Sequence, residues 1–67
     1  MKVWIDKQGG THFHKENCQI VKSPMFHYEP VEKRLRLYTE FGHRMYHNIR
    51  VDGKLYSPCV CMIKELK

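Results

Sequence analysis

Cysteine and histidine carry the most specific chemistry in this sequence. They occur in two short segments, residues 13–18 (FHKENC) and residues 56–61 (YSPCVC), which together offer one imidazole and three thiols. A structural zinc ion takes four such donors in a tetrahedron, and three cysteines with one histidine is a common set. The sequence therefore predicts a structural Zn²⁺ site formed by His14, Cys18, Cys59 and Cys61.

Other interpretations of these residues stay open. Buried thiols can pack as small apolar side chains without any metal, and Cys18 could form a redox disulfide with one of the other two cysteines. The close spacing of those two cysteines argues against simple packing. Within the zinc interpretation we prefer His14, because its spacing to Cys18 suits a compact chelate, but His12 or His47 could replace one ligand.

The first ligand pair is predicted to follow an N-terminal β-hairpin. Residues 2–6 contain three consecutive β-formers, residues 9–10 are both glycine, and residues 11–14 form the returning strand. Asn17 is a suitable N-cap for a short helix over residues 18–22. This arrangement places the first cysteine at a strand-to-helix corner.

The second ligand pair is predicted to open a C-terminal helix. Ser57 is a suitable N-cap and Pro58 a suitable first helical residue, so we expect a helix from Pro58 to near the C-terminus. The free N–H groups at its start would favour the thiolate form of both cysteines. Its inward-facing side chains are predicted to be Val60, Ile63 and Leu66.

The middle of the chain is predicted to form an ordered loop and then a basic hairpin. The loop covers residues 24–32, which contain two prolines and two aromatic residues. Residues 33–41 and residues 44–51 alternate between apolar and polar side chains, which predicts two half-buried strands. We expect a turn at residues 42–43 between them, and a basic outer face on the first strand.

A second, tighter hairpin turn is predicted at residues 52–53 (DG). A type I′ turn needs positive φ at both central residues, and this dipeptide tolerates it well. The turn leads into a strand over residues 54–57, and its register pairs Ile49 with Tyr56 and Arg50 with Leu55.

The length and composition fit one small domain. The chain has 67 residues, of which 42% are hydrophobic and 28% charged, as is typical of soluble globular proteins. A core this small is often supplemented by a metal ion. We therefore predict a single zinc-binding domain over residues 1–67, with a β-hairpin insertion around residues 33–56. Its class is predicted to be α+β, a small antiparallel sheet with one or two short helices around a single zinc.

The cysteine count and the hydropathy pattern indicate where in the cell the protein is expected. Three cysteines are an odd number, which does not suit a secreted disulfide framework. No apolar run approaches the length of a membrane span, and the first residues do not resemble a signal peptide. We expect a cytoplasmic protein that does not bind a membrane.

Residues 3–22 and 55–66 resemble the Ada-type metal-binding fold. This family includes the N-terminal zinc domain of the bacterial Ada DNA-repair protein and other small bacterial modules. The resemblance lies in the Phe-His-x-x-x-Cys motif that ends at Cys18 and the Tyr-x-Pro-Cys-x-Cys motif that ends at Cys61. It implies a small β-sheet with flanking helices around one zinc, held by His14, Cys18, Cys59 and Cys61.

Two departures from the family pattern bear on function. The last two cysteines are one residue closer than the family's Cys-x-x-Cys, and the middle of the chain is more strand-like and basic. In the Ada repair domain a zinc-bound thiolate accepts a methyl group from a DNA phosphotriester, and His14 occupies the corresponding position here. Because an imidazole lacks that sulfur nucleophile, the resemblance implies a structural zinc without methyl transfer, and we expect no enzymatic activity.

Two kinds of partner suit the sequence. The formal net charge of +5 favours an anionic partner such as nucleic acid. The alternative is a protein-interaction module, for example a bacterial phage or mobile-element protein that binds a host factor through Trp4, Phe26 and Tyr28. We expect a monomer, or a homodimer joined at an exposed strand edge. The candidate nucleic-acid surface comprises Lys33, Arg34, Arg36, Tyr38, Arg44, Tyr46, Arg50 and Lys54.

Overall fold

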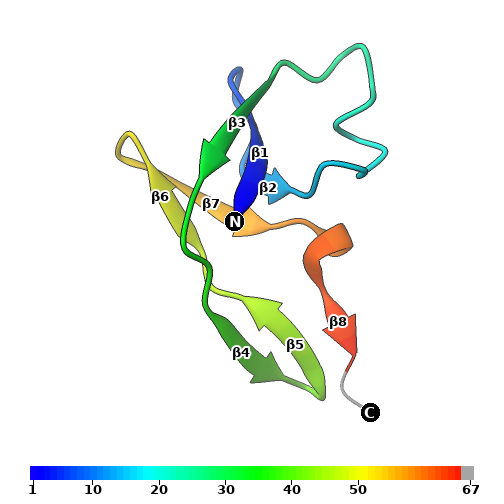
Figure 1. Cartoon of the computed structure of the whole chain (residues 1–67), viewed down its shortest axis with the longest axis vertical. Helices are drawn as coiled ribbons and strands as arrows, with labels where there is room; N and C mark the ends of the chain where they lie inside the picture. The colour runs from blue at the N-terminus through cyan, green and yellow to red at the C-terminus, as the bar shows by residue number, and fades with distance from the viewer. Residues whose placement is uncertain (66–67) are drawn as a thin grey trace.

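The computed structural model describes residues 1–65, whose regular secondary structure is almost all β-strand (Figure 1). The predicted α+β class is therefore wrong, because neither predicted helix forms in the described residues. The elements in chain order are β1 (Lys2–Asp6), β2 (His12–His14), β3 (Tyr28–Glu32), β4 (Leu37–Glu40), β5 (His43–Tyr46), β6 (Ile49–Val51), β7 (Lys54–Pro58), the 3₁₀ turn η1 (Val60–Met62) and β8 (Lys64–Glu65).

The strands form two sheets. The larger has the order β3-β1-β2-β7-β6, and the smaller has the order β4-β5-β8. All neighbouring strands are antiparallel except β2 and β7, which run parallel. Figure 1 shows the β4–β5 hairpin at one end of the molecule and the β1–β2–β3 strands towards the other. The parallel β2–β7 pair joins the N-terminal strands to the C-terminal hairpin.

The N-terminal hairpin forms as predicted, and a third strand extends it. Its turn needs two glycines, since Gly9 has a φ of +88° and a Cβ on Gly10 would lie 2.4 Å from the Cβ of Asp6. The predicted loop over residues 24–32 is wrong in its second half, where β3 pairs along the whole of β1. Pro30 is tolerated there because β3 is an edge strand and needs no backbone donor on its outer side.

The two predicted middle strands are shorter or divided. Only β4 forms within residues 33–41, and all four of its residues are exposed, so the alternation there did not mark a buried face. The predicted strand over residues 44–51 is split between β5 and β6, which belong to different sheets. The turn before β5 lies at Phe41 and Gly42, where φ is +50° and +80°, one residue earlier than predicted.

The second hairpin turn is confirmed. Asp52 and Gly53 have φ values of +51° and +82°, as a type I′ turn requires. The register of β6 and β7 pairs Ile49 with Tyr56 and Arg50 with Leu55, as the sequence predicts.

Backbone hydrogen bonding to β2 explains why the C-terminal helix does not form. Pro58 pairs with Phe13, and the Cys59 N–H donates to the Phe13 carbonyl at 3.0 Å, so β7 stays extended through the predicted N-cap. The chain then makes only the 3₁₀ turn η1 before β8 pairs with β5. Of the three residues predicted to face inward, Val60 is exposed, Ile63 is half-buried, and Leu66 lies outside the described residues.

The segment predicted as the first helix makes a series of tight turns instead. The N–H groups of residues 21, 22 and 23 each donate to the carbonyl three residues earlier, at 3.1 to 3.2 Å. Each of these bonds closes a turn of the 3₁₀ kind rather than an α-helical turn. The chain therefore curls tightly around Cys18 without building a helix.

The apolar core lies on one face of the larger sheet. Val3, Ile5 and Phe13 face it from β1 and β2, because alternate residues of a strand point to the same side. Ile49, Tyr56 and Met62 complete the buried cluster from later parts of the chain. The opposite face of β1 and β2 carries Trp4 and His14, which are paired in register.

No helix among the described residues is long and apolar enough to cross a membrane.

Candidate metal centre

Four potential metal ligands come together beside the face of β1 and β2 that carries Trp4 and His14. His14 ends β2, Cys18 lies in the turns that follow, Cys59 comes directly after β7, and Cys61 lies in η1. One ligand atom from each of the four lies within 4.8 Å of all the others. The first three side chains are buried and Cys61 is half-buried. These four residues could hold a metal ion, and they are the set that the sequence predicts.

The spacing of the ligand atoms fits tetrahedral zinc. Zinc bonds of about 2.3 Å to sulfur and about 2.0 Å to nitrogen place neighbouring donors roughly 3.5–3.8 Å apart in a tetrahedron. The Nδ1 atom of His14 lies 3.7 Å from the Sγ atom of Cys18, within that range. All the other pairs lie within 4.8 Å, so small side-chain adjustments suffice to complete the coordination.

The parallel pairing of β2 with β7 aligns the two ligand segments. Phe13 is paired with Pro58, so the next residue on each strand is a ligand, His14 on one and Cys59 on the other. Since successive side chains alternate between faces, both ligands point away from the core face that Phe13 occupies. The register of one strand pair therefore brings the two ends of the chain to the same site.

Hydrogen bonds around Cys18 favour its thiolate. Burial alone raises the pKa of the Cys18 thiol, but hydrogen bonds from the Ile20 backbone N–H, from the Cys61 and Cys59 side chains and from the Val21 backbone N–H lower it by more. The pKa of Cys18 is therefore lowered overall. A thiolate is the form that binds zinc.

The pKa values of Cys61 and His14 are also shifted, in directions that keep both side chains neutral without a metal. Burial, together with the neighbouring sulfurs of Cys18 and Cys59, raises the pKa of the Cys61 thiol to about 12, although the Lys15 backbone N–H acts against this. Burial lowers the pKa of His14, which keeps the imidazole neutral and able to donate its lone pair. Three adjacent thiols cannot all ionise without a compensating positive charge, which a divalent ion would provide.

Apolar and aromatic side chains enclose the cluster. Cys18, Val21 and Cys59 form a small buried group, with Trp4 and Phe26 packed against it. The Phe26 ring meets the His14 ring edge to face, with centroids 5.1 Å apart. This packing restricts the orientation of the imidazole and shields the Cys18 and Cys59 side chains from water.

The two alternative histidines lie elsewhere. His12 shares the face of β2 with His14, but its side chain is exposed and its Nδ1 atom lies 3.0 Å from the Thr11 hydroxyl. His47 is exposed and its ring lies 4.7 Å from that of Tyr38. Neither belongs to the group of four. All three cysteines are free in this structure, so none of them forms the redox disulfide that the sequence also allowed.

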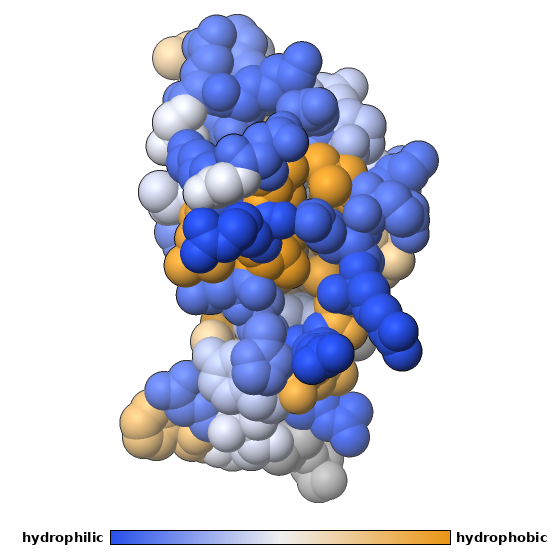
Figure 2. All heavy atoms as spheres, turned by 90° about the vertical axis from the view of Figure 1, so that its left-hand side faces the viewer, coloured by the Kyte–Doolittle hydropathy of each residue, from blue (hydrophilic) through white to orange (hydrophobic). Residues whose placement is uncertain are grey.

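The candidate nucleic-acid residues do not share one face. Tyr38 pairs with Met45, so it points to the opposite side of the β4–β5 hairpin from Arg44 and Tyr46. Arg50 donates a hydrogen bond to the Gly53 carbonyl at 3.0 Å, which braces the hairpin turn. On the face in Figure 2, hydrophilic side chains surround an area of hydrophobic surface. The exposed members of the set are Arg34, Arg36, Tyr38, Arg44, Arg50 and Lys54, whereas Lys33 and Tyr46 are half-buried.

Sequence reasoning missed the surroundings of the metal centre. It treated Trp4, Phe26 and Tyr28 as exposed aromatics of a contact surface, and it gave no role to Glu16 or Lys22. All five line one cavity beside the ligands. The alternation of Trp4 with Val3 and Ile5 in β1 was a local signal that its ring faces away from the core.

Comparisons with protein-family models, with curated proteins and with solved structures found no match to this chain.

Proposed function

We propose that this chain is a small zinc module in which one Zn²⁺ holds the N-terminal strands to the C-terminal segment. The observation that carries the proposal is the convergence of four ligand atoms within 4.8 Å from the two ends of the chain. Thiols and imidazole are the donors of structural zinc sites, whereas magnesium and calcium prefer oxygen. Four protein ligands leave no coordination position for a substrate, so the proposed role is structural and non-enzymatic.

We also propose that the metal site is related to that of the Ada-type metal-binding fold. It is supported by the ligand types and by their order along the chain, one histidine and one cysteine followed by a close cysteine pair. We also place the protein in a reducing compartment such as the cytoplasm, since free thiols bind zinc only while they are reduced. Within the proposal, residues 1–67 act as one zinc-binding domain.

Native mass spectrometry of the full chain, with and without EDTA, tests the zinc proposal. We expect one Zn²⁺ per chain, loss of that mass with the chelator, and a lower unfolding temperature of the stripped protein. The variant His14→Ala should bind zinc far more weakly, whereas the matched variant His12→Ala should bind it normally. A chain that melts at the same temperature with and without EDTA would contradict the proposal, and a bound mass matching iron would correct the ion.

The proposed partner of the module is nucleic acid. The support is the net charge of +5 and the exposed guanidinium groups of Arg34, Arg36 and Arg44 near the β4–β5 hairpin. Such groups neutralise phosphates, and the resulting affinity falls as salt concentration rises. Because the basic side chains occupy more than one face, we expect weak contact without sequence preference.

A salt titration tests this partner. The double variant Arg36→Glu, Arg44→Glu should lose most of its affinity for DNA and RNA at low salt while keeping its zinc. The alternative partner, a host protein, would be indicated by capture of a protein from a nuclease-treated bacterial lysate together with no nucleic-acid affinity at any salt concentration. That pair of results would overturn the nucleic-acid proposal.

A further inference from the structure

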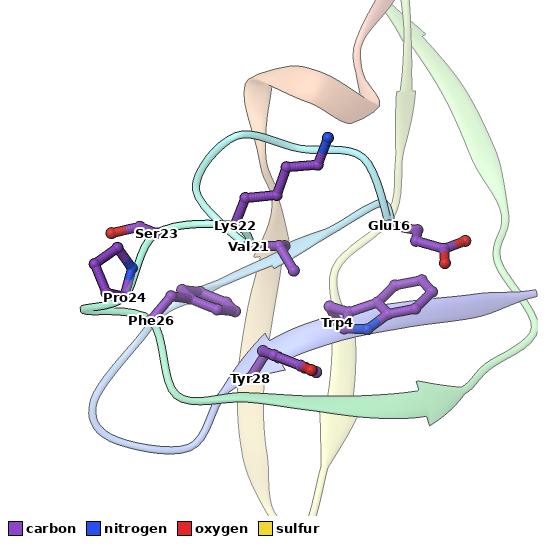
Figure 3. Close-up of a pocket in the computed structure, with 8 residues that line it drawn as sticks. All are labelled: Trp4, Glu16, Val21, Lys22, Ser23, Pro24, Phe26 and Tyr28. Atoms are coloured by element: carbon purple, nitrogen blue, oxygen red, sulfur yellow. The ribbon is translucent and has the colours of Figure 1, made fainter.

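A cavity of about 520 Å³ adjoins the metal centre. Its lining includes the rings of Trp4, Phe26 and Tyr28 and the charged side chains of Glu16 and Lys22 (Figure 3). This volume lies within the range of small-molecule sites, about 300–1,000 Å³. The lining combines three aromatic rings with one charge of each sign, which are groups that can contact a flat polar ligand.

The strand register explains why the aromatic rings gather there. Trp4 pairs with Pro30 and Asp6 pairs with Tyr28, so Trp4 and Tyr28 are diagonal neighbours on one face of the β1–β3 pair. Phe26 comes from the turns before β3, where its N–H donates to the Ser23 carbonyl at 3.1 Å. Figure 3 shows the Phe26 and Trp4 rings on either side of Val21, with Tyr28 beneath and the Lys22 side chain above.

The aromatic side chains around the cavity are only partly buried. Trp4 and Phe26 are only half-buried, and Tyr28 keeps 53% of its surface exposed. Fully buried rings such as Phe13 serve the core on the other face of the sheet. The rings around the cavity therefore keep surface that a ligand could contact.

We propose that the cavity beside the metal centre binds an unpaired nucleobase, stacked on the rings of Trp4, Phe26 and Tyr28. Stacking of bases on aromatic side chains is the usual means of holding single-stranded nucleic acid. The Glu16 carboxylate can accept a hydrogen bond from a base amino group, and the Lys22 ammonium can neutralise the attached phosphate. The inference rests on the proposed nucleic-acid contact but uses a different surface.

The charges of the lining distinguish this ligand from a methylated ammonium ion. A cation would also be attracted to three aromatic rings. The Glu16 carboxylate would attract such an ion, but the Lys22 ammonium lines the same cavity and would repel it, so the two charges give no net preference for a lone cation. A neutral base with an anionic phosphate suits both charged side chains.

Two lining residues, Val21 and Phe26, connect the cavity to the potential metal ligands, none of which lines it. Its outer wall is the segment that starts at Cys18 and includes Val21, which is buried against the cluster, and Phe26, whose ring edge meets His14. Release of the metal would free this segment from the sheet. Base binding is therefore expected to require the bound ion.

Trp4 is the single tryptophan of the chain, and its fluorescence reports on the cavity. We would titrate the zinc-loaded full chain with a nucleoside monophosphate, with a short single-stranded oligonucleotide and with a trimethyl-lysine peptide. Quenching by the oligonucleotide supports the proposal with a strand as the source of the base. Quenching by the monophosphate at similar concentrations supports it with a free nucleotide as the source.

Matched variants separate the cavity from the basic surface. Tyr28→Ala should weaken base binding by about fivefold to a hundredfold, the range expected for one lost stack, and Tyr28→Phe should restore it. Phe41→Ala, which removes a 90% exposed ring that lies outside the lining and outside the candidate basic surface, should have no effect. Lys22→Glu should weaken binding more than Lys7→Glu, which changes the net charge equally but lies outside the lining. Zinc content measured for each variant confirms that it is folded.

Two outcomes would overturn the inference. In the first, only the trimethyl-lysine peptide quenches Trp4. In the second, Tyr28→Ala binds the oligonucleotide as tightly as the unchanged chain, while the double variant Arg36→Glu, Arg44→Glu does not. The second outcome leaves the proposed nucleic-acid function standing and removes the cavity from it.

Discussion

The two faces of the β1–β2 hairpin are held in different ways. One face carries Val3, Ile5 and Phe13, which are almost wholly buried in an apolar core. The other carries Trp4 and His14, beside three cysteines and a smaller apolar cluster. The core face gains stability from the area it removes from water, whereas the second face buries a smaller cluster that contains the four potential metal ligands.

This difference suggests why so small a chain combines an apolar core on one face with a potential metal site on the other. A single core of six buried residues is marginal for a domain of this size, and bound zinc is one of the usual supplements. Placing the supplement on the opposite face lets each strand residue contribute to one or the other. The comparison predicts that a substitution in the core weakens the core without changing zinc affinity.

Removing a sulfur ligand should have the largest effect. Cys59→Ser is expected to abolish tight zinc binding, and the free energy of metal binding in small zinc domains is about 10–16 kcal/mol. Thermal unfolding and native mass spectrometry would show a lost ion and a large drop in the unfolding temperature. If Cys59→Ser kept both its zinc and its melting temperature, the second face would need another explanation.

Truncating the core should come next. Phe13 is fully buried, and Phe13→Ala is expected to cost about 3–5 kcal/mol of unfolding free energy. At saturating zinc the variant should still bind one ion, because the ligands lie on the other face. The control Phe41→Ala removes a 90% exposed ring and should change stability by less than about 0.5 kcal/mol.

The stripped and loaded proteins should respond to pH in opposite directions. The pKa of Cys61 is raised to about 12 in the folded chain without metal, above its usual value of 9.0. Its contribution to stability is therefore complete below pH 9 and is lost as the pH rises towards 12.

The zinc-loaded protein should instead lose stability in acid, because protons compete with the metal for the thiolates. Chemical denaturation with and without EDTA across the pH range measures both trends. Parallel pH curves for the two forms would contradict the assignment of Cys61 as a ligand. Cys61→Ser should remove the alkaline loss from the stripped protein.

The smallest expected effect is at the β6–β7 turn. Gly53 has a φ of +82°, so Gly53→Ala should cost about 1–2 kcal/mol through backbone strain. The hairpin supplies Ile49 and Tyr56 to the core, so only the core face should weaken, and zinc affinity should be unchanged. An isothermal titration with a competing chelator would detect any change in zinc affinity and so test whether the faces are coupled.

Local residue chemistry determined part of this structure without help from the rest of the chain. The paired glycines after β1 and the Asp52–Gly53 turn depend on φ values that few other residues tolerate, so both hairpins and the register of the second were predictable. The group of four residues that could hold a metal ion was also predictable, because thiols and imidazole at such spacing have few other uses.

Only the tertiary structure decided how these pieces combine. Pairing with β1 turned part of the proline-containing segment before residue 33 into β3, and pairing with β2 kept Ser57 and Pro58 extended where local preference favoured a helix. Intrinsic preferences differ by less than about 1 kcal/mol per residue, so hydrogen bonds to a distant strand can override them. The same parallel pair brought His14 next to Cys59, a proximity that depends on contacts between residues far apart in the sequence.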